Sequence, residues 1–110
     1  MSAFDPDTLP ATIAAYFATS GNRDAVDLFA ADAVVVDEGE THEGLAAIAA
    51  WLDSVERRYR PRYVLHGTTT DTSGHDVTFE VSGTFPGSPA ILRQHFELDQ
   101  QARIRRLQTL

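Results

Sequence analysis

The sequence predicts an α+β domain in which helices cover one face of an antiparallel sheet. In the first half of the chain, apolar residues recur at helical spacing. In the second half, from Tyr63 onward, apolar and polar residues alternate as they do in strands, and turn residues separate the segments. Helices followed by a run of strands are typical of this fold class. A chain of 110 residues has the size of one domain, which we place at residues 1–110.

Three helices are predicted in the first half. The first runs over residues 11–20 and is capped by Asp7 or Thr8, and a short second helix covers residues 25–30. The third runs from Leu45 to Tyr59, and Pro61 stops it because proline disfavours helical backbone at the residue before it. Its expected buried residues are Leu45, Ile48, Leu52 and Val55, with Trp51 beside them.

Five strands are expected. The first covers residues 34–37 and is apolar on both faces, so it should lie in a sheet that other structure covers. The acidic turn 38–40 follows it. Four further strands are expected over residues 63–72, 76–85, 90–98 and 103–110, with turns at 71–74 and 86–89.

Composition excludes several kinds of function. The net charge of −7 argues against binding to nucleic acid or to anionic membranes, which carry the same sign. No apolar run approaches the ~20 residues that span a bilayer, and the N-terminus lacks the pattern of a signal peptide, so we expect a cytoplasmic protein. All nine basic residues are arginine, which suggests a GC-rich bacterial source and excludes a Schiff-base lysine.

Neither a metal nor another cofactor is expected. The chain has no cysteine, and its four histidines show no metal-ligand spacing. His66 follows an apolar pair on a predicted strand and is a candidate second acid or base, although an ordinary strand histidine explains it as well.

Asp37 is the main candidate for chemistry. It ends the buried strand 34–37, and a carboxylate at the edge of a core is partly desolvated and suited to moving protons. The alternative is structural, because an aspartate in the segment 37–40 can close the strand through hydrogen bonds to the backbone.

Residues 16–52 resemble the nuclear-transport-factor-2-like superfamily, and within it the SnoaL-like polyketide cyclases and the ketosteroid isomerases. The residues that carry the resemblance are Leu28-Phe29-Ala30, Asp32-Ala33, Asp37, Gly44, Ala47-Ile48 and Trp51. The resemblance implies a cone: a curved antiparallel sheet wrapped around a long helix, with two N-terminal helices and an apolar pocket inside. It also implies a homodimer packed through the outer face of the sheet.

The resemblance implies roles for three residues. Asp37 occupies the place of the general base of the ketosteroid isomerases, and Tyr16 that of their oxyanion-binding tyrosine. Their second oxyanion donor is a protonated aspartate two residues before a phenylalanine. Here Gln94 stands at that distance before Phe96, which is a departure from the isomerase pattern, although an amide can still donate a hydrogen bond.

The remaining candidates are expected to contact a ligand. Gln94 is a polar residue on an otherwise apolar strand face, and a buried amide needs partners. Trp51, Phe79 and Phe96 lie on inward faces, where they would line the pocket or fill it as ordinary core residues. Tyr16 has the same two interpretations.

Three hypotheses remain at this point. The first is a cofactor-independent isomerase or cyclase that binds a small hydrophobic carbonyl compound, with Asp37 as acid and base and with Tyr16 and Gln94 polarising the oxygen. The second is a non-catalytic ligand-binding or dimerisation module of the same fold. The third is a core in which aromatic side chains fill the pocket completely.

Overall fold

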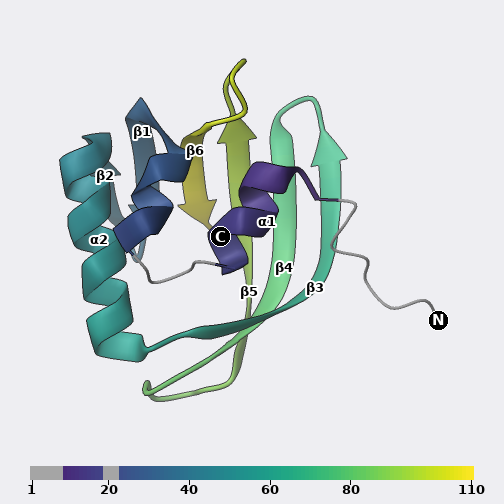
Figure 1. The fold of residues 1–110 in the computed structure, drawn as a ribbon. Coiled ribbons are helices and arrows are strands. Elements are labelled where there is room, and N and C mark those ends of the chain that lie inside the picture. The colour runs from purple at the N-terminus through teal and green to yellow at the C-terminus, as the bar shows by residue number, and fades with distance from the viewer. Residues whose placement is uncertain (1–8, 19–22) are drawn as a thin grey trace.

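A computed structural model describes residues 9–18 and 23–110 of the chain (Figure 1). The predicted caps Asp7 and Thr8 and the predicted end of the first helix lie outside these residues. The described elements are α1 (Ala11–Ala18), the 3₁₀ helix η2 (Arg23–Leu28), β1 (Phe29–Asp37), β2 (Glu40–Glu43), α2 (Gly44–Tyr59), β3 (Arg62–Asp71), β4 (Gly74–Ser82), β5 (Ala90–Leu98) and β6 (Ile104–Thr109).

The strands form one curved sheet in the order β2-β1-β6-β5-β4-β3. Neighbouring strands are antiparallel except β1 and β6, which run parallel. Figure 1 shows β3 and β4 bending toward the end of α2, which lies beside β1 and β2, while α1 crosses β4 and β5. The predicted fold class, a cone built from a curved sheet and helices, is confirmed.

The first strand is longer than predicted and has a partner that was not predicted. It begins at Phe29, so the predicted helix over residues 25–30 is instead a 3₁₀ turn that ends at Leu28. Phe29 is buried and pairs with Ile104 of β6, and this tertiary contact overrides the local helical pattern. The unpredicted strand β2 pairs with β1 through a two-residue turn. Both turn residues, Glu38 and Gly39, have positive φ angles, 51° and 77°, as a tight hairpin turn requires.

Aromatic side chains fix α1 to the sheet. The ring of Phe17 lies 5.2 Å from that of Phe79 on β4 and 5.7 Å from that of Phe96 on β5. Tyr16 packs edge-to-face on Phe96, with ring centres 5.5 Å apart. Such contacts contribute about 0.5–1.5 kcal/mol each beyond their buried area. They hold one edge of Tyr16 against the core and orient the residue within the cone.

Helix α2 starts and stops close to its predicted ends. Ile48, Trp51 and Leu52 are buried, but Leu45 is 39% exposed, so its predicted burial is wrong. Leu45 lies in the first turn, next to the exposed strand β2, where little structure covers it. No helix among the described residues has the length and apolar character needed to cross a membrane.

Candidate functional site

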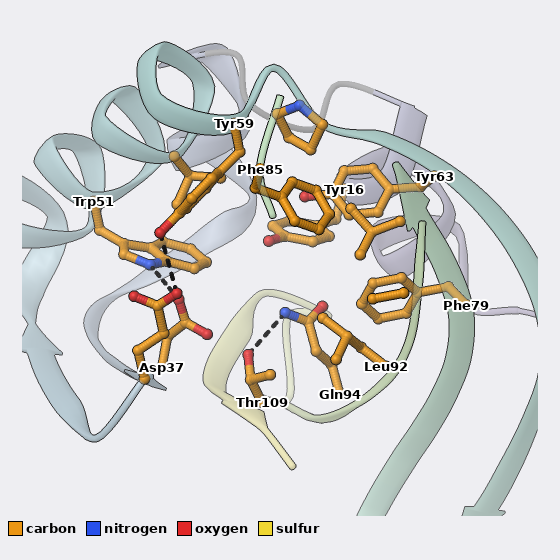
Figure 2. Close-up of a pocket in the computed structure, with 15 residues that line it drawn as sticks. Tyr16, Asp37, Trp51, Tyr59, Tyr63, Phe79, Phe85, Leu92, Gln94 and Thr109 are labelled. Carbon is orange, nitrogen blue, oxygen red and sulfur yellow. Dashed lines mark hydrogen bonds between the residues drawn. The ribbon is translucent and has the colours of Figure 1, made fainter. Parts of the chain in front are cut away.

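A cavity of about 250 Å³ lies between α2 and the inner face of the sheet (Figure 2). Most of its lining is apolar or aromatic. The lining residues are Tyr16, Asp37, Glu38, Trp51, Val55, Tyr59, Pro61, Tyr63, Phe79, Val81, Phe85, Ala90, Leu92, Gln94 and Thr109. The cavity thus draws on α1, α2, β1 and the four last strands, and Phe79, Phe85 and Trp51 form walls around it.

Asp37 enters the cavity from the end of β1. The Nε1–H of Trp51 donates a hydrogen bond to Oδ2 of Asp37 across 3.1 Å. Figure 2 shows the indole and the carboxylate together on one side of the cavity. The hairpin turn after Asp37 reverses the chain immediately, so the side chain stays at the rim of the core and is not fully buried. A carboxylate in this position faces apolar surface on one side and is oriented by a neutral donor on the other.

Tyr16 and Tyr63 line the same cavity as that carboxylate. Burial raises the pKa of Tyr16 well above its ordinary value of 10.0, and the nearby Tyr63 and Asp37 raise it further. Burial likewise raises the pKa of Tyr63 to about 12, with additional contributions from Asp37 and Glu56. A phenol with the ordinary pKa of 10.0 is already protonated at neutral pH, and these shifts extend that range, so both can donate hydrogen bonds into the cavity.

Gln94 supplies the amide of the site. The side chain is only 6% exposed, and its Nε2 donates to Oγ1 of Thr109 across 3.1 Å. Its Oε1 is buried and has no hydrogen-bond partner among the described residues. Thr109 is the direct cross-strand neighbour of Gln94 on β6, so the ladder between β5 and β6 holds the two side chains together.

A second cavity, of about 310 Å³, lies on the other side of Asp37 and Trp51. It is enclosed by the β1–β2 hairpin and the outer side of α2, and it is more polar, with Glu40, His42 and Arg58 in its lining. Tyr59 lines both cavities and donates a hydrogen bond from its hydroxyl to Oε1 of Glu38 across 3.2 Å. The side chains of Asp37, Trp51 and Tyr59 therefore separate an apolar space from a polar one.

The structure brings together five of the seven predicted site residues: Tyr16, Asp37, Trp51, Phe79 and Gln94 all line the apolar cavity. His66 does not, because it is exposed and lies on the opposite face of β3 from Tyr63 and Leu65. Phe96 does not either; it is fully buried behind Tyr16 and Phe17 and belongs to the core.

Tyr63 and Thr109 are lining residues that the sequence did not reveal. The alternation of β3 could have indicated Tyr63, since it shares a face with Leu65. No group of three or more potential metal-ligating side chains occurs among residues 9–18 and 23–110.

Known structures share this architecture. A candidate polyketide cyclase from Sinorhizobium meliloti is 34% identical, with a TM-score of 0.91 over 97% of this chain and 100% of that chain. The chain belongs to the nuclear-transport-factor-2-like superfamily. No protein-family model and no curated protein matches the sequence.

More distant members of the superfamily share the fold. A hypothetical protein from Catenulispora acidiphila with a ketosteroid isomerase-like fold, in complex with trimethylamine, is 20% identical, with a TM-score of 0.77 over 94% of this chain and 86% of that chain. A candidate isomerase of the SnoaL-like family from Agrobacterium tumefaciens is 18% identical, with a TM-score of 0.69 over 86% of this chain and 91% of that chain. The superfamily resemblance of residues 16–52 is thus confirmed.

Proposed function

We propose that the protein binds a small hydrophobic carbonyl compound in the apolar cavity and moves a proton at the carbon next to the carbonyl. The observation that carries this proposal is the convergence of a carboxylate and protonated phenols on one apolar space. Asp37 is the proton acceptor, and the hydroxyl of Tyr16 stabilises the oxygen on which negative charge develops.

The electrostatics of the cavity support this division of roles. A neutral donor, the indole of Trp51, holds one carboxylate oxygen of Asp37, and the other oxygen receives no hydrogen bond from the described residues. The phenols of Tyr16 and Tyr63 are neutral at neutral pH, as a tyrosine with the ordinary pKa of 10.0 already is, and their raised pKa values extend this range, so they donate hydrogen bonds and do not repel the carboxylate. Enolisation needs this pair of functions: a base for the proton and donors for the oxygen.

The relatives agree with this chemistry at the level of reaction class. The relative from Sinorhizobium meliloti is a candidate polyketide cyclase, and that from Agrobacterium tumefaciens a candidate isomerase. Ring closure of a polyketide and isomerisation next to a carbonyl both begin with the removal of a proton from an activated carbon. We assign this shared step to Asp37.

Proton exchange tests the proposal without knowledge of the natural substrate. The probe is 1-indanone in D₂O, and NMR follows the exchange of its α-protons. The protein should accelerate the exchange, and Asp37→Asn should reduce the acceleration by about 100- to 10,000-fold. Asp53→Asn is the control, because that carboxylate is paired with Arg57 at 3.2 Å on the solvent side of α2. An Asp37→Asn variant as active as the parent would contradict the assignment.

A non-catalytic binding module is the second candidate function. The observation that favours it is Gln94, whose Nε2 is already engaged by Thr109 and whose free end in this arrangement is an acceptor. A module of this kind would bind 1-indanone with a saturable signal and leave the rate of proton exchange unchanged.

We also propose that two copies of the chain associate through the outer face of the sheet. Val64 and Ile91 are each 57% exposed, which is unusual for large apolar side chains on a strand. Both pair in register with Glu80, so they flank one position on the outer face. A second copy would cover them.

A further inference from the structure

The amide of Gln94 is buried and only half satisfied. Its Nε2 donates a hydrogen bond to Thr109, but its Oε1 has no partner among the described residues. Water cannot replace that partner easily, because the residue is only 6% exposed. Figure 2 shows the amide of Gln94 at the wall of the cavity, with its Nε2 turned toward Thr109. A buried polar atom without a partner destabilises the structure, and a ligand that supplies the partner removes that cost.

Thr109 allows the amide to be used in either orientation. The two ends of an amide have nearly the same shape, and one end accepts hydrogen bonds while the other donates them. A threonine hydroxyl can accept a hydrogen bond from Nε2 or, after rotation, donate one to Oε1. Turning the Gln94 amide over therefore keeps one bond to Thr109 and replaces the acceptor in the cavity by a donor.

We propose that Gln94 and Thr109 together form a reversible recognition element that binds both hydrogen-bond acceptors and hydrogen-bond donors on a ligand. This inference rests on the proposed function and specifies its ligand. During enolisation, a carbonyl oxygen, which only accepts, becomes an enol hydroxyl, which can donate. Gln94 can bond to both forms, and Thr109 is the positioning residue that stabilises each orientation of the amide.

Other groups in the cavity could meet the same ligand atom. Asp37 accepts hydrogen bonds, and the hydroxyls of Tyr16 and Tyr63 donate and accept them. Binding of a polar ligand alone therefore does not identify its partner. The test needs ligands of one shape and variants at Gln94 and Thr109.

Three bicyclic compounds of similar size provide the probes: indole, which donates through its N–H; 1-indanone, which accepts through its carbonyl; and indene, which does neither. Dissociation constants are measured by NMR titration of the full chain. Gln94→Met keeps the length of the side chain and removes the amide. This variant should bind indole and 1-indanone about 3- to 10-fold more weakly than the parent, in line with one lost hydrogen bond. Its dissociation constant for indene should be unchanged.

Thr109 has its own pair of variants. Valine has nearly the same shape as threonine and lacks the hydroxyl. Thr109→Val should therefore bind both indole and 1-indanone more weakly than the parent, whereas its affinity for indene should not change. Thr109→Ser keeps the hydroxyl and should bind all three probes like the parent. A merely structural role of Thr109 would change indene binding as well.

If the variants lose affinity for indole alone, the amide is fixed with Oε1 toward the cavity. If they lose affinity for 1-indanone alone, the amide is fixed in the opposite orientation. Either result, or no loss at all, overturns the inference. If Gln94→Met does not fold, the two Thr109 variants distinguish the same outcomes. None of these titrations requires proton transfer, so a protein that binds both probes through Gln94 but exchanges no protons would refute the proposed chemistry and leave this inference standing.

Discussion

The indole Nε1–H of Trp51 donates a hydrogen bond to Oδ2 of Asp37, and this bond joins helix α2 to the end of strand β1. The two residues are 14 positions apart, separated by the β1–β2 hairpin and the first two turns of α2. Trp51 is thus more than a wall of the cavity. It fixes the direction in which the carboxylate points.

Replacing Trp51 by phenylalanine should remove this orientation. Trp51→Phe keeps an aromatic wall but loses the donor, so Asp37 gains rotational freedom and its rate of proton exchange on 1-indanone should fall by about 10-fold. The free energy of unfolding should fall by about 1 kcal/mol for the lost bond and volume. NMR exchange and urea denaturation measure the two effects, with Asp53→Asn on the same helix as control. An exchange rate equal to that of the parent would show that Trp51 does not position the base.

The sequence was sufficient to predict the elements whose patterns are local. Helix α2 and strand β5 begin and end within one residue of their predicted bounds, because α2 carries a helical apolar stripe and β5 lies between the turn 86–89 and the polar segment 99–101. Strand β2 was missed because its four residues, Glu40–Glu43, contain no apolar alternation and depend on pairing with β1.

The residues of the candidate site likewise fall into those that a local pattern predicts and those that depend on the tertiary structure. Asp37 follows a recognisable strand and Gln94 interrupts an apolar face, so both were predicted as candidates and both line the cavity. The partner of Gln94, Thr109, comes from another strand, and only the strand order and register place Thr109 opposite Gln94. His66 was misplaced because the alternation of β3 puts it on the face opposite Tyr63 and Leu65, and the alternation alone does not tell which of the two faces is inward.

Gly83 should not tolerate a larger side chain. A Cβ atom at this position would overlap the backbone oxygen of Tyr59, because the segment after β4 passes directly against the end of α2. The amide of Thr84 donates to that same oxygen across 2.8 Å, which holds the two segments close. Gly83→Ala should therefore lower the free energy of unfolding by about 1–3 kcal/mol, as overpacking does.

Urea denaturation measures the effect of Gly83→Ala. Gly67→Ala is the matched control, because a Cβ there meets nothing within 4 Å. Equal losses in the two variants would mean that contact with Tyr59 does not decide the outcome. The β4–β5 connection carries Phe85 against Tyr59 with ring centres 5.8 Å apart, so Gly83→Ala should also weaken the binding of indene.

His95 should make the stability of the protein depend on pH. Partial burial lowers its pKa, but the bond to Asp76, the charge of Glu97 and the backbone oxygen of Ser73 together raise the pKa above its ordinary value of 6.5. Since the folded state holds the proton more tightly, the stabilisation is fully present below the unfolded pKa and is lost as pH rises through the folded pKa.

Comparison of the parent with His95→Gln isolates this contribution. The difference in urea midpoint should be largest at about pH 6, below the ordinary pKa of 6.5, and should shrink as the pH rises through the raised pKa of the folded state. His66→Gln is the control, because that histidine is exposed on β3. If the difference in urea midpoint stays constant or grows with pH, protonated His95 does not stabilise the fold through its hydrogen bonds to Asp76 and Ser73.

The proposed dimer has a direct test at Ile91. Ile91→Arg places a charge beside Glu80 on the outer face of the sheet. The charge is solvated in a monomer, but it would have to be buried against a second copy, which costs free energy. Sedimentation equilibrium should give a dimer for the parent and a monomer for the variant. Leu45→Arg, which changes an exposed leucine on α2, should remain a dimer. A monomeric parent at high concentration would exclude this interface.

Alkaline pH should destabilise the protein through the buried phenols. The pKa of Tyr63 is about 12 in the folded state, compared with the ordinary value of 10.0, so above about pH 10 the unfolded chain releases a proton that the folded chain keeps. The unfolded state then binds fewer protons, and the free energy of unfolding falls as pH rises, by up to about 1.4 kcal/mol per pH unit for this residue. Tyr16 acts in the same direction.

Tyr63→Phe keeps the ring that packs on Phe17 and Phe79, at 5.5 and 5.4 Å between ring centres, and removes the titrating hydroxyl. Its free energy of unfolding should therefore fall less steeply than that of the parent between about pH 9 and pH 11. Urea denaturation at several pH values measures the two slopes, and tyrosinate absorbance reports the titration itself. Identical slopes would mean that the Tyr63 hydroxyl ionises as easily in the folded protein as in water. Above about pH 10 it would then carry charge into the cavity and repel Asp37.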